Sequence, residues 1–301
     1  METPLSRKYF VILNPEAGRG RGAKIREKIE AELQRHHLSF EISETSFKGH
    51  AEKLAEEAPE EFDVIVAAGG DGTFNEVANG LMRNPRTMGL IPTGSGNDFA
   101  RAMNIPFNYK KAIHVLAQSV EKTIDIGWVN GRYFPNGLGI GFDALVVHES
   151  NQVKRLRGIL IYLFSVLKSV FFYSSPRMTL RLDNGKIIDG KIFMLTIGNG
   201  ISLGGGFMLT PNAKNNDGLF DVCVIHYLTK PQIFWHLPKV FWGGHVKMKQ
   251  VEMHRVKEIA VSAHEPIGAH VDGELIGMEN REFQVKIFPE ALRVIGGIPR
   301  A

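Results

Sequence analysis

The sequence predicts two domains: an N-terminal α/β domain built on a parallel sheet with helices, and a C-terminal domain that is mainly an antiparallel β-sandwich. Up to residue 124, short apolar runs alternate with segments of helical periodicity, the order typical of parallel sheets. After residue 124, short runs rich in branched and aromatic residues dominate, with Gly, Asn and Asp between them. The predicted domains therefore span 1–124 and 125–289. A chain of 301 residues, 44% of them hydrophobic, suffices for two cores.

Each predicted strand of the first domain leads into a loop and then into a helical segment. The apolar runs with glycine-bearing loops behind them are 9–13, 64–67 and 88–91. After the first loop, Ile25, Ile29 and Leu33 recur every four residues and form one apolar stripe of a helix. The carboxyl ends of parallel strands meet at one edge of a sheet, where open α/β folds bind ligands. We therefore expect the three loops to converge there.

The loop after the run 64–67 is the most informative stretch of the chain. Residues 68–76 read Ala-Gly-Gly-Asp-Gly-Thr-Phe-Asn-Glu, and a helix is expected over 75–81. The glycines let the backbone approach a ligand closely, and the helix N-terminus attracts an anion. Asp71 repels a bare phosphate, which indicates a cation beside it, most simply Mg²⁺ on a nucleotide.

The alternative for this loop is a generic Gly-rich turn with a solvated aspartate. Three polar residues that follow at once disfavour it: Thr73, Asn75 and Glu76. Neither of the common nucleotide fingerprints, G-x-G-x-x-G and G-x-x-x-x-G-K-[ST], occurs in the chain. The residues alone therefore predict a phosphate-binding α/β domain of unusual type.

Short branched and aromatic runs define the second domain. The strands expected there are 122–129, 178–182, 191–197, 219–226, 259–262 and 283–288. A two-residue hairpin is expected at Asp272-Gly273, which lies between apolar runs. The hairpin explains Asp272 completely, and Glu274, the first residue after it, could equally be a solvated strand end. The loop at Asp217 is likewise a turn by its residues.

The most apolar stretch, 159–173, predicts a helix that does not span a membrane. Fifteen residues give a helix about 22 Å long, short of the roughly 30 Å hydrocarbon core. Its apolar residues lie all round the helix, which favours burial between layers. Contact with lipid is the other interpretation, with the basic residues Lys154, Arg155 and Arg157 just upstream. The aromatic residues of 233–242 present the same alternatives.

Composition narrows the partners and the compartment. A net charge of +4 and a pI near 9 suit an anionic membrane surface, nucleic acid, or neither. No zinc-ligand spacing or long basic run supports nucleic acid, so no nucleic-acid partner is expected. The single cysteine, Cys223, excludes a disulfide framework within the chain, and no signal peptide is evident, so a cytoplasmic protein is expected.

A set of motifs, taken in order, resembles the diacylglycerol kinase catalytic domain family, and more closely its soluble bacterial lipid kinases, which are relatives of sphingosine and ceramide kinases. The motifs are Asn14-Pro15 with Ala17-Gly18, Gly69-Gly70-Asp71-Gly72-Thr73, Gly94-Ser95-Gly96-Asn97-Asp98, Gly139-Ile140-Gly141-Phe142-Asp143-Ala144, the loop 210–221, and Asp272-Gly273-Glu274. They cover essentially the whole chain. The second motif also occurs in NAD kinases and nearly in phosphofructokinases, which implies a first domain of that kind. Ser95 departs from the family, which more often has threonine, but it retains the hydroxyl.

The resemblance implies a kinase that uses ATP and Mg²⁺ to phosphorylate a free hydroxyl of a lipid. Diacylglycerol, phosphatidylglycerol and sphingoid bases all remain open as substrates. The implied nucleotide-binding residues are Asn14, Pro15, Gly18, Thr45, Gly69, Gly70, Asp71, Gly72, Thr73, Asn75, Glu76, Ser95, Asn97 and Asp98. Asp71 would organise Mg²⁺, helped by Asp98, and Glu274 would act as the general base, with Asp272 as the alternative.

The resemblance also implies features outside the nucleotide site. A structural Mg²⁺ would be held by Asp217 and by the backbone carbonyls of Lys214 and Leu219. The tail 290–301 would return to the first domain. The implied partners are a membrane lipid substrate and, transiently, the membrane surface, so that the active protein is peripherally membrane-associated; a homodimer is left open. Two rival functions remain: a kinase of a soluble substrate, as in NAD kinases, and a non-catalytic protein that responds to nucleotide.

Overall fold

The computed structural model describes residues 7–152 and 159–297, and Lys154, Arg155 and Arg157 lie outside them. The chain forms two compact units. Unit 1 comprises Met1–Ile124 with Glu290–Ala301, and unit 2 comprises Asp125–Pro289. Within the described residues, no helix is long and apolar enough to cross a membrane.

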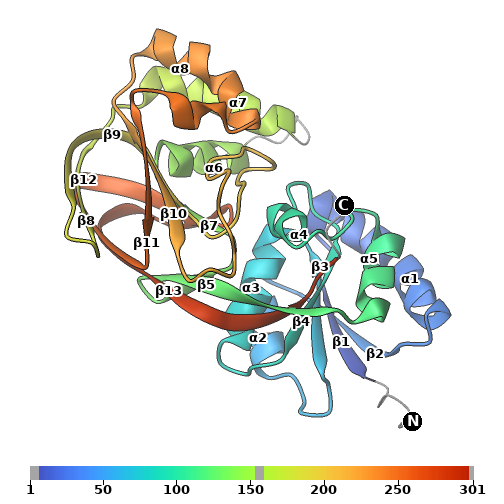
Figure 1. The fold of residues 1–301 in the computed structure, drawn as a ribbon. Helices are drawn as coiled ribbons and strands as arrows, with labels where there is room; N and C mark the ends of the chain where they lie inside the picture. Colours follow the sequence, from blue (N-terminus) through green and yellow to red (C-terminus); the bar gives the residue numbers. More distant parts are fainter. Residues whose placement is uncertain (1–6, 153–158, 298–301) are drawn as a thin grey trace. The chain divides into compact units, whose positions relative to one another are not determined.

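Unit 1 is a parallel sheet covered by helices on both faces (Figure 1). Its strands run in the spatial order β4-β3-β1-β2, and the last residues of β13 pair with β4 through Val294 and Met88. The strands are β1 Lys8–Leu13, β2 Ser39–Glu44, β3 Val64–Gly69 and β4 Thr87–Pro92. The helices are α1 Ala17–Arg35, α2 His50–Glu56, α3 Asp71–Leu81, α4 Asp98–Ala102 and α5 Tyr109–Gln118. Every residue of β3 and β4 is buried, as central strands covered on both faces must be.

Helix α3 begins at Asp71, four residues before the start expected from the sequence. Gly70 has an extended backbone and immediately precedes the helix, so β3 and α3 are separated by a single residue. Asp71 lies in the first turn, where a carboxylate is stabilised by the positive end of the helix dipole. The residues expected to form a loop are therefore largely the first turn of a helix.

Unit 2 is mainly antiparallel, as the sequence predicted. Its strands, of which β5 begins and β13 ends in unit 1, are β5 Glu121–Val129, β6 Arg132–Phe134, β7 Gly137–Gly141, β8 Arg177–Leu182, β9 Ile187–Gly198, β10 Phe220–His226, β11 Val251–Val256, β12 Glu258–Val271 and β13 Glu274–Ile295. The order is β11-β10-β9-β7-β12-β13, β8 pairs with both β9 and β12, and β5 pairs with β6 and β13. β7 and β8 each pair with both β9 and β12. These four strands, β7, β8, β9 and β12, therefore form a closed ring around an apolar interior.

The sequence missed three strands of unit 2: the three-residue β6, β7 and β11. Strand β7 contains three glycines, which weaken any strand pattern. It forms because both its edges pair with long strands, β9 and β12, distant in the sequence. Strand β11 carries charged residues and pairs along one edge only, with β10. The expected hairpin at Asp272-Gly273 is confirmed: both residues have positive φ, and Val271 pairs with Glu274.

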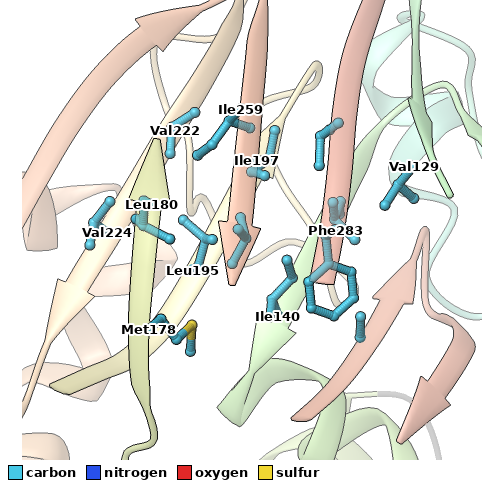
Figure 2. Close-up of a cluster of buried hydrophobic side chains, with 14 of the residues drawn as sticks. Val129, Ile140, Met178, Leu180, Leu195, Ile197, Val222, Val224, Ile259 and Phe283 are labelled. Carbon is cyan, nitrogen blue, oxygen red and sulfur yellow. The ribbon is translucent and has the colours of Figure 1, made fainter. Parts of the chain in front are cut away.

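Two apolar cores lie on opposite faces of the central strands of unit 2. Along β10, Val222 and Val224 point into the sandwich, whereas Cys223 and Ile225 point into a second cluster. Figure 2 shows the sandwich core, where side chains from β8, β9, β10 and β12 pack together. The second core lies beneath α6 Phe142–Gln152, α7 Ile159–Phe172, α8 Lys230–His236 and the short 3-10 helices η1 Leu237–Phe241 and η2 Gly244–Lys247. Both faces of β10 are therefore buried, and Cys223 is a buried residue of this strand.

Candidate functional site

The loops after β1, β3 and β4 lie against one another at the carboxyl edge of the unit 1 sheet. Asn14 Nδ2 donates to Thr73 Oγ1 at 2.9 Å, which ties the first loop to α3. The Thr93 backbone N–H donates to the carbonyl of Gly69 at 2.8 Å, which ties the third loop to the second. The Thr45 N–H donates to the carbonyl of Leu13 at 2.9 Å, so the end of β2 joins the same edge. The convergence expected from the sequence is present.

Glycines in these loops are needed where one loop packs on another. A Cβ on Gly94 would lie 2.5 Å from Gly70 Cα, and a Cβ on Gly18 would lie 2.4 Å from the carbonyl oxygen of Thr93. Gly18 also begins a run of left-handed residues that includes Arg19, a conformation unfavourable for a residue with a side chain. The glycines thus allow the three loops to pack closely on one another, in addition to any approach of the backbone to a ligand that they allow.

Polar groups in these loops fit a phosphate ligand with its metal ion. Asp71 Oδ1 accepts the Phe99 N–H at 3.2 Å, so the carboxylates of Asp71 and Asp98 stand in the first turns of neighbouring helices, α3 and α4. Carboxylate oxygens are the donors that Mg²⁺ prefers. Thr93 Oγ1 and Asn97 Oδ1 are buried and make no hydrogen bond within the described residues. Unpaired buried oxygens are unusual in a folded protein and are expected at a ligand site.

Several of the expected nucleotide contacts also have a structural role. Glu76 accepts the N–H groups of Gly49 and Ala51 at 2.8 and 3.1 Å and so caps the start of α2. Asn75 is fully buried, and its Oδ1 accepts from Asn79 at 3.2 Å. The remaining expected contacts lie on the same loops: Pro15 and Gly72 are half-buried, and Ser95 is exposed between β4 and α4. A direct nucleotide contact from each of these residues stays a prediction.

In unit 2, Asp272 ties the β12–β13 hairpin to β7. Its Oδ1 accepts the Gly137 N–H at 2.8 Å, and its own N–H donates to the Gly137 carbonyl at 2.9 Å. The residue is buried and has a φ of +49°, a left-handed conformation that Asp tolerates. Glu274, two residues on, is half-buried at the start of β13. This geometry gives Asp272 a structural explanation and leaves Glu274 as the better candidate for the base.

An unexpected pair, Asp143 and His270, lies beside this hairpin. Asp143 Oδ2 is 3.1 Å from His270 Nε2, both atoms are buried, and neither makes a hydrogen bond of good geometry within the described residues. His270 Nδ1 accepts the Gly273 N–H at 3.2 Å, which places the ring proton on Nε2, facing Asp143. A Cβ at Gly139 would lie 2.3 Å from both partners, so only glycine fits there.

Asp143 also lines a largely apolar cavity within unit 2. The cavity lies beneath α6, α7, α8 and η1 and is open on one side. Its lining includes Val166, Phe193 and Ile225, and its polar side chains are Asp143, His236 and His245. Burial lowers the pKa of both histidines, so they are neutral at neutral pH. The cavity therefore suits an apolar ligand with a polar group near Asp143.

The loop proposed to hold a structural Mg²⁺ is arranged around an arginine. One oxygen of Asp217 accepts the Leu219 N–H at 3.2 Å, and the other pairs with Arg255. Arg255 also lies 3.7 Å from Asp221, and burial raises the pKa of the Asp221 carboxyl. Across residues 7–152 and 159–297, no group of three or more His, Cys, Asp or Glu side chains is arranged to hold a metal ion. The donors around Asp217 do not fit Mg²⁺ in this arrangement, because a guanidinium already neutralises the carboxylate. The ion held by Lys214, Asp217 and Leu219 stays a prediction.

Sequence reasoning missed His270 and the cavity. Asp143 was recognised only as part of a motif, and nothing near His270 in the sequence indicates a partner so far away along the chain. Thr93, whose hydroxyl has no hydrogen-bond partner within the described residues, could have been identified as a candidate ligand contact. It lies between Pro92 and Gly94, in a loop that the sequence had already singled out.

Comparison with known proteins identifies both units. Residues 8–129 match the model of the diacylglycerol kinase catalytic domain, and residues 137–296 match that of the YegS C-terminal NAD kinase beta sandwich-like domain. The diacylglycerol kinase of Bacillus subtilis strain 168 is 33% identical over 280 residues, which cover 91% of each chain. That of Staphylococcus carnosus strain TM300 is 28% identical and covers 89% of this chain and 88% of its own.

Solved structures show the same fold. A crystal structure from Bacillus anthracis strain Sterne superposes with a TM-score of 0.80 at 25% identity, covering 98% of this chain and 99% of that one. A second, described as a diacylglycerol kinase of the same organism, gives a TM-score of 0.76 at 22% identity.

Proposed function

The chain belongs to the diacylglycerol kinase family, and we propose that it transfers the γ-phosphoryl group of ATP to a free hydroxyl of a membrane lipid such as diacylglycerol. Relatives that bear the name diacylglycerol kinase match about nine-tenths of the chain, and both units match the two domains of the family in order. The substrate and the dependence on Mg²⁺ are the parts of this proposal that need experiment.

The apolar cavity of unit 2 is the observation that best supports a lipid as the substrate. Its walls are aliphatic and aromatic apart from three polar side chains, so it complements an acyl chain and offers little to a polar dinucleotide. A carboxylate at one wall, Asp143, gives a hydroxyl a hydrogen-bond acceptor. This favours a lipid kinase over the rival kinase of a soluble substrate such as NAD.

Unit 1 is proposed to hold the nucleotide. Phosphoryl transfer depends mainly on positioning and on neutralising phosphate charge. The loops after β1, β3 and β4 supply backbone amides, the N-terminus of α3 and the unpaired oxygens of Thr93 and Asn97. Asp71 and Asp98 would hold Mg²⁺, which when bound neutralises charge on the phosphates. The structural tie from Asn14 to Thr73 keeps two of these loops together.

In unit 2, Glu274 is proposed to accept the proton of the lipid hydroxyl. Asp272 is held in a fixed, buried conformation by its two hydrogen bonds with Gly137, and it positions the turn that presents Glu274. His270 supports the same turn through the Gly273 N–H and orients toward Asp143. These contacts connect Asp143, in the wall of the cavity, through His270 to the turn that carries the proposed base.

The test is a kinase assay of the purified chain with radiolabelled ATP and Mg²⁺ against diacylglycerol, phosphatidylglycerol, a sphingoid base and NAD, each analysed for labelled product. We expect a labelled lipid and no labelled NAD. Labelled NAD in the absence of lipid would support the soluble-substrate alternative. Nucleotide binding without turnover of any substrate would support the non-catalytic one.

A matched pair of variants tests the cavity itself. Val240 lines the cavity from η1, whereas Val246 on η2 is also half-buried but does not line it. Val240→Trp should lower turnover of long-chain diacylglycerol at least tenfold by filling the space, and Val246→Trp should leave it near the parental value. Equal effects of the two substitutions, in variants of equal thermal stability, would remove the cavity from the substrate site.

A further inference from the structure

Helix α7 exposes its largest apolar side chains and buries its serines. Phe171 and Phe172 are 59% and 81% exposed, whereas Ser165 and Ser169 are 0% and 2% exposed. Neither serine hydroxyl has a hydrogen-bond partner within the described residues. Val166 and Val170 are buried beside the serines, but a surface helix in water does not normally expose rings of this size. One side of this helix is therefore buried, as the burial interpretation predicts, and the other presents aromatic rings to the outside; contact with lipid stays a prediction.

The exposed aromatic side chains continue onto the neighbouring elements. Trp235 on α8 is 77% exposed, and Trp242, which ends η1, is 62% exposed. The rings of Phe171 and Phe234 are 6.0 Å apart, and Lys230 Nζ donates to the Phe171 carbonyl at 2.7 Å, so α7 and α8 are packed together (Figure 1). We call these exposed aromatics, Phe171, Phe172, Trp235 and Trp242, the aromatic surface. Single exposed apolar residues are ordinary, but a group on adjoining helices marks an interaction site.

The sequence around the aromatic surface is basic and has no acidic residue. Residues 151–176 and 227–251 contain eight Lys and Arg and no Asp or Glu, so the rest of the chain, with 28 basic and 32 acidic residues, is net negative. Lys168 is paired with Glu149 of α6, which cancels its charge. Lys230, Lys247 and Lys249 are exposed. The positive charge of the molecule is thus concentrated in the segments that bear the exposed rings.

We propose that the aromatic surface docks on an anionic lipid bilayer, with the tryptophans at the level of the head groups and the lysines against the anionic lipids. Aromatic side chains flanked by lysines are the chemistry of interfacial membrane binding. The same elements that carry these rings also line the cavity, through Val166 of α7, Ile233 of α8 and Val240 of η1. The role of docking rests on the proposed function, because it would bring the cavity to the membrane that contains the substrate.

Vesicle binding tests the docking without any enzymatic step. The full chain, without nucleotide, is sedimented with vesicles of phosphatidylglycerol and phosphatidylcholine in equal parts, and with vesicles of phosphatidylcholine alone. We expect binding to the anionic vesicles that weakens as salt is added. The double variant Phe172→Ser/Trp235→Ser should bind about tenfold more weakly or worse, since it removes two rings that docking would bury. The matched control is Ile187→Ser, an exposed apolar residue of β9 that should bind like the parent.

A charge pair and a fluorescence measurement complete the test. Lys247→Glu/Lys249→Glu should abolish the preference for anionic vesicles, whereas Lys110→Glu, at an exposed residue of α5 in unit 1, should preserve it. Trp235→Phe should keep binding but reduce quenching of tryptophan fluorescence by brominated lipid. Equal binding of the parent and the double variant, or no binding of the parent to either vesicle, would overturn the docking surface.

Kinase activity separates failure of the docking from failure of the proposed function. The double variant should phosphorylate a monomeric short-chain diacylglycerol at the parental rate and vesicle-embedded diacylglycerol much more slowly. Equal loss on both substrates would place these residues in the reaction and overturn a docking role. A parent that binds anionic vesicles but phosphorylates no lipid would refute the proposed function and leave the docking intact.

Discussion

The hydrogen bond from the Gly137 N–H to Asp272 allows the structural role of Asp272 to be separated from catalysis. Asp272→Ala removes a buried charged acceptor and leaves the Gly137 N–H without that partner, which costs about 1.5–3 kcal/mol. It also places alanine at a φ of +49°, which adds roughly 1 kcal/mol. We expect unit 2 of this variant to be destabilised by about 2.5–4 kcal/mol. Asp272→Asn keeps the oxygen and tolerates the left-handed backbone, so it should cost only about 1 kcal/mol.

Denaturant unfolding followed by tryptophan fluorescence measures this difference in the right place. All three tryptophans, Trp128, Trp235 and Trp242, belong to unit 2, so their signal reports unfolding of that unit even when unit 1 unfolds separately. An Asp272→Ala protein that unfolds within about 0.5 kcal/mol of the parent would refute the structural role.

Turnover gives the second half of the same prediction. Glu274→Gln should fold like the parent and lose roughly 10²–10⁴-fold in turnover, as expected when a general base is removed. Asp272→Asn should retain most of its turnover. A dead Asp272→Asn beside a near-parental Glu274→Gln would reverse the roles of the two acids.

Three further predictions concern charged groups. Asp71→Asn should remove nearly all kinase activity without a change in fold by circular dichroism, because the first turn of α3 would lose the charge proposed to hold Mg²⁺; parental turnover at saturating ATP and Mg²⁺ would contradict this. If Asp217 ligates a structural Mg²⁺, added Mg²⁺ should raise the melting temperature of the parent and not of Asp217→Ala, whereas identical responses would leave Asp217 with its ion pair to Arg255 and its hydrogen bond from the Leu219 N–H. Hydrogen bonds from Lys186 and His226 lower the pKa of Glu252 to about 2, so its contribution to stability is present above its ordinary pKa and is lost as the pH falls toward 2. Because this carboxylate is partly exposed, Glu252→Gln should flatten the acid loss of stability by less than about 1 kcal/mol, measured by denaturant unfolding between pH 5 and 2.

Features governed by local sequence were the ones predicted from it. The apolar runs that became β1, β3 and β4, and the Asp272-Gly273 hairpin, follow from side-chain patterning and turn chemistry over a few residues. Convergence of the glycine loops follows from the parallel order of the strands. These local rules account for the alternating β/α and antiparallel classes of the two units.

Features that depend on distant pairing escaped the sequence. The glycine-rich β7 is a strand only because β9 and β12 flank it, and the contact of Asp143 with His270 exists only after β7 and β12 have paired. The cavity is assembled from side chains of three α-helices, two strands and two 3-10 helices, and no single segment carries its signature. The start of α3 was placed late because glycines near a helix N-terminus weaken the periodic pattern.

Side chains of β10 point alternately into the sandwich core and into the cluster that contains the cavity, so substitutions on this strand can affect one core without the other. Val222 and Val224 belong to the sandwich core, whereas Cys223 and Ile225 belong to the cluster beneath the helices, where Ile225 lines the cavity. A substitution at one set of positions can reshape the cavity while the other set keeps the sandwich packed. Related chains could therefore diverge in the length or bulk of the ligand they accept by changing alternate residues of one strand, without a new fold.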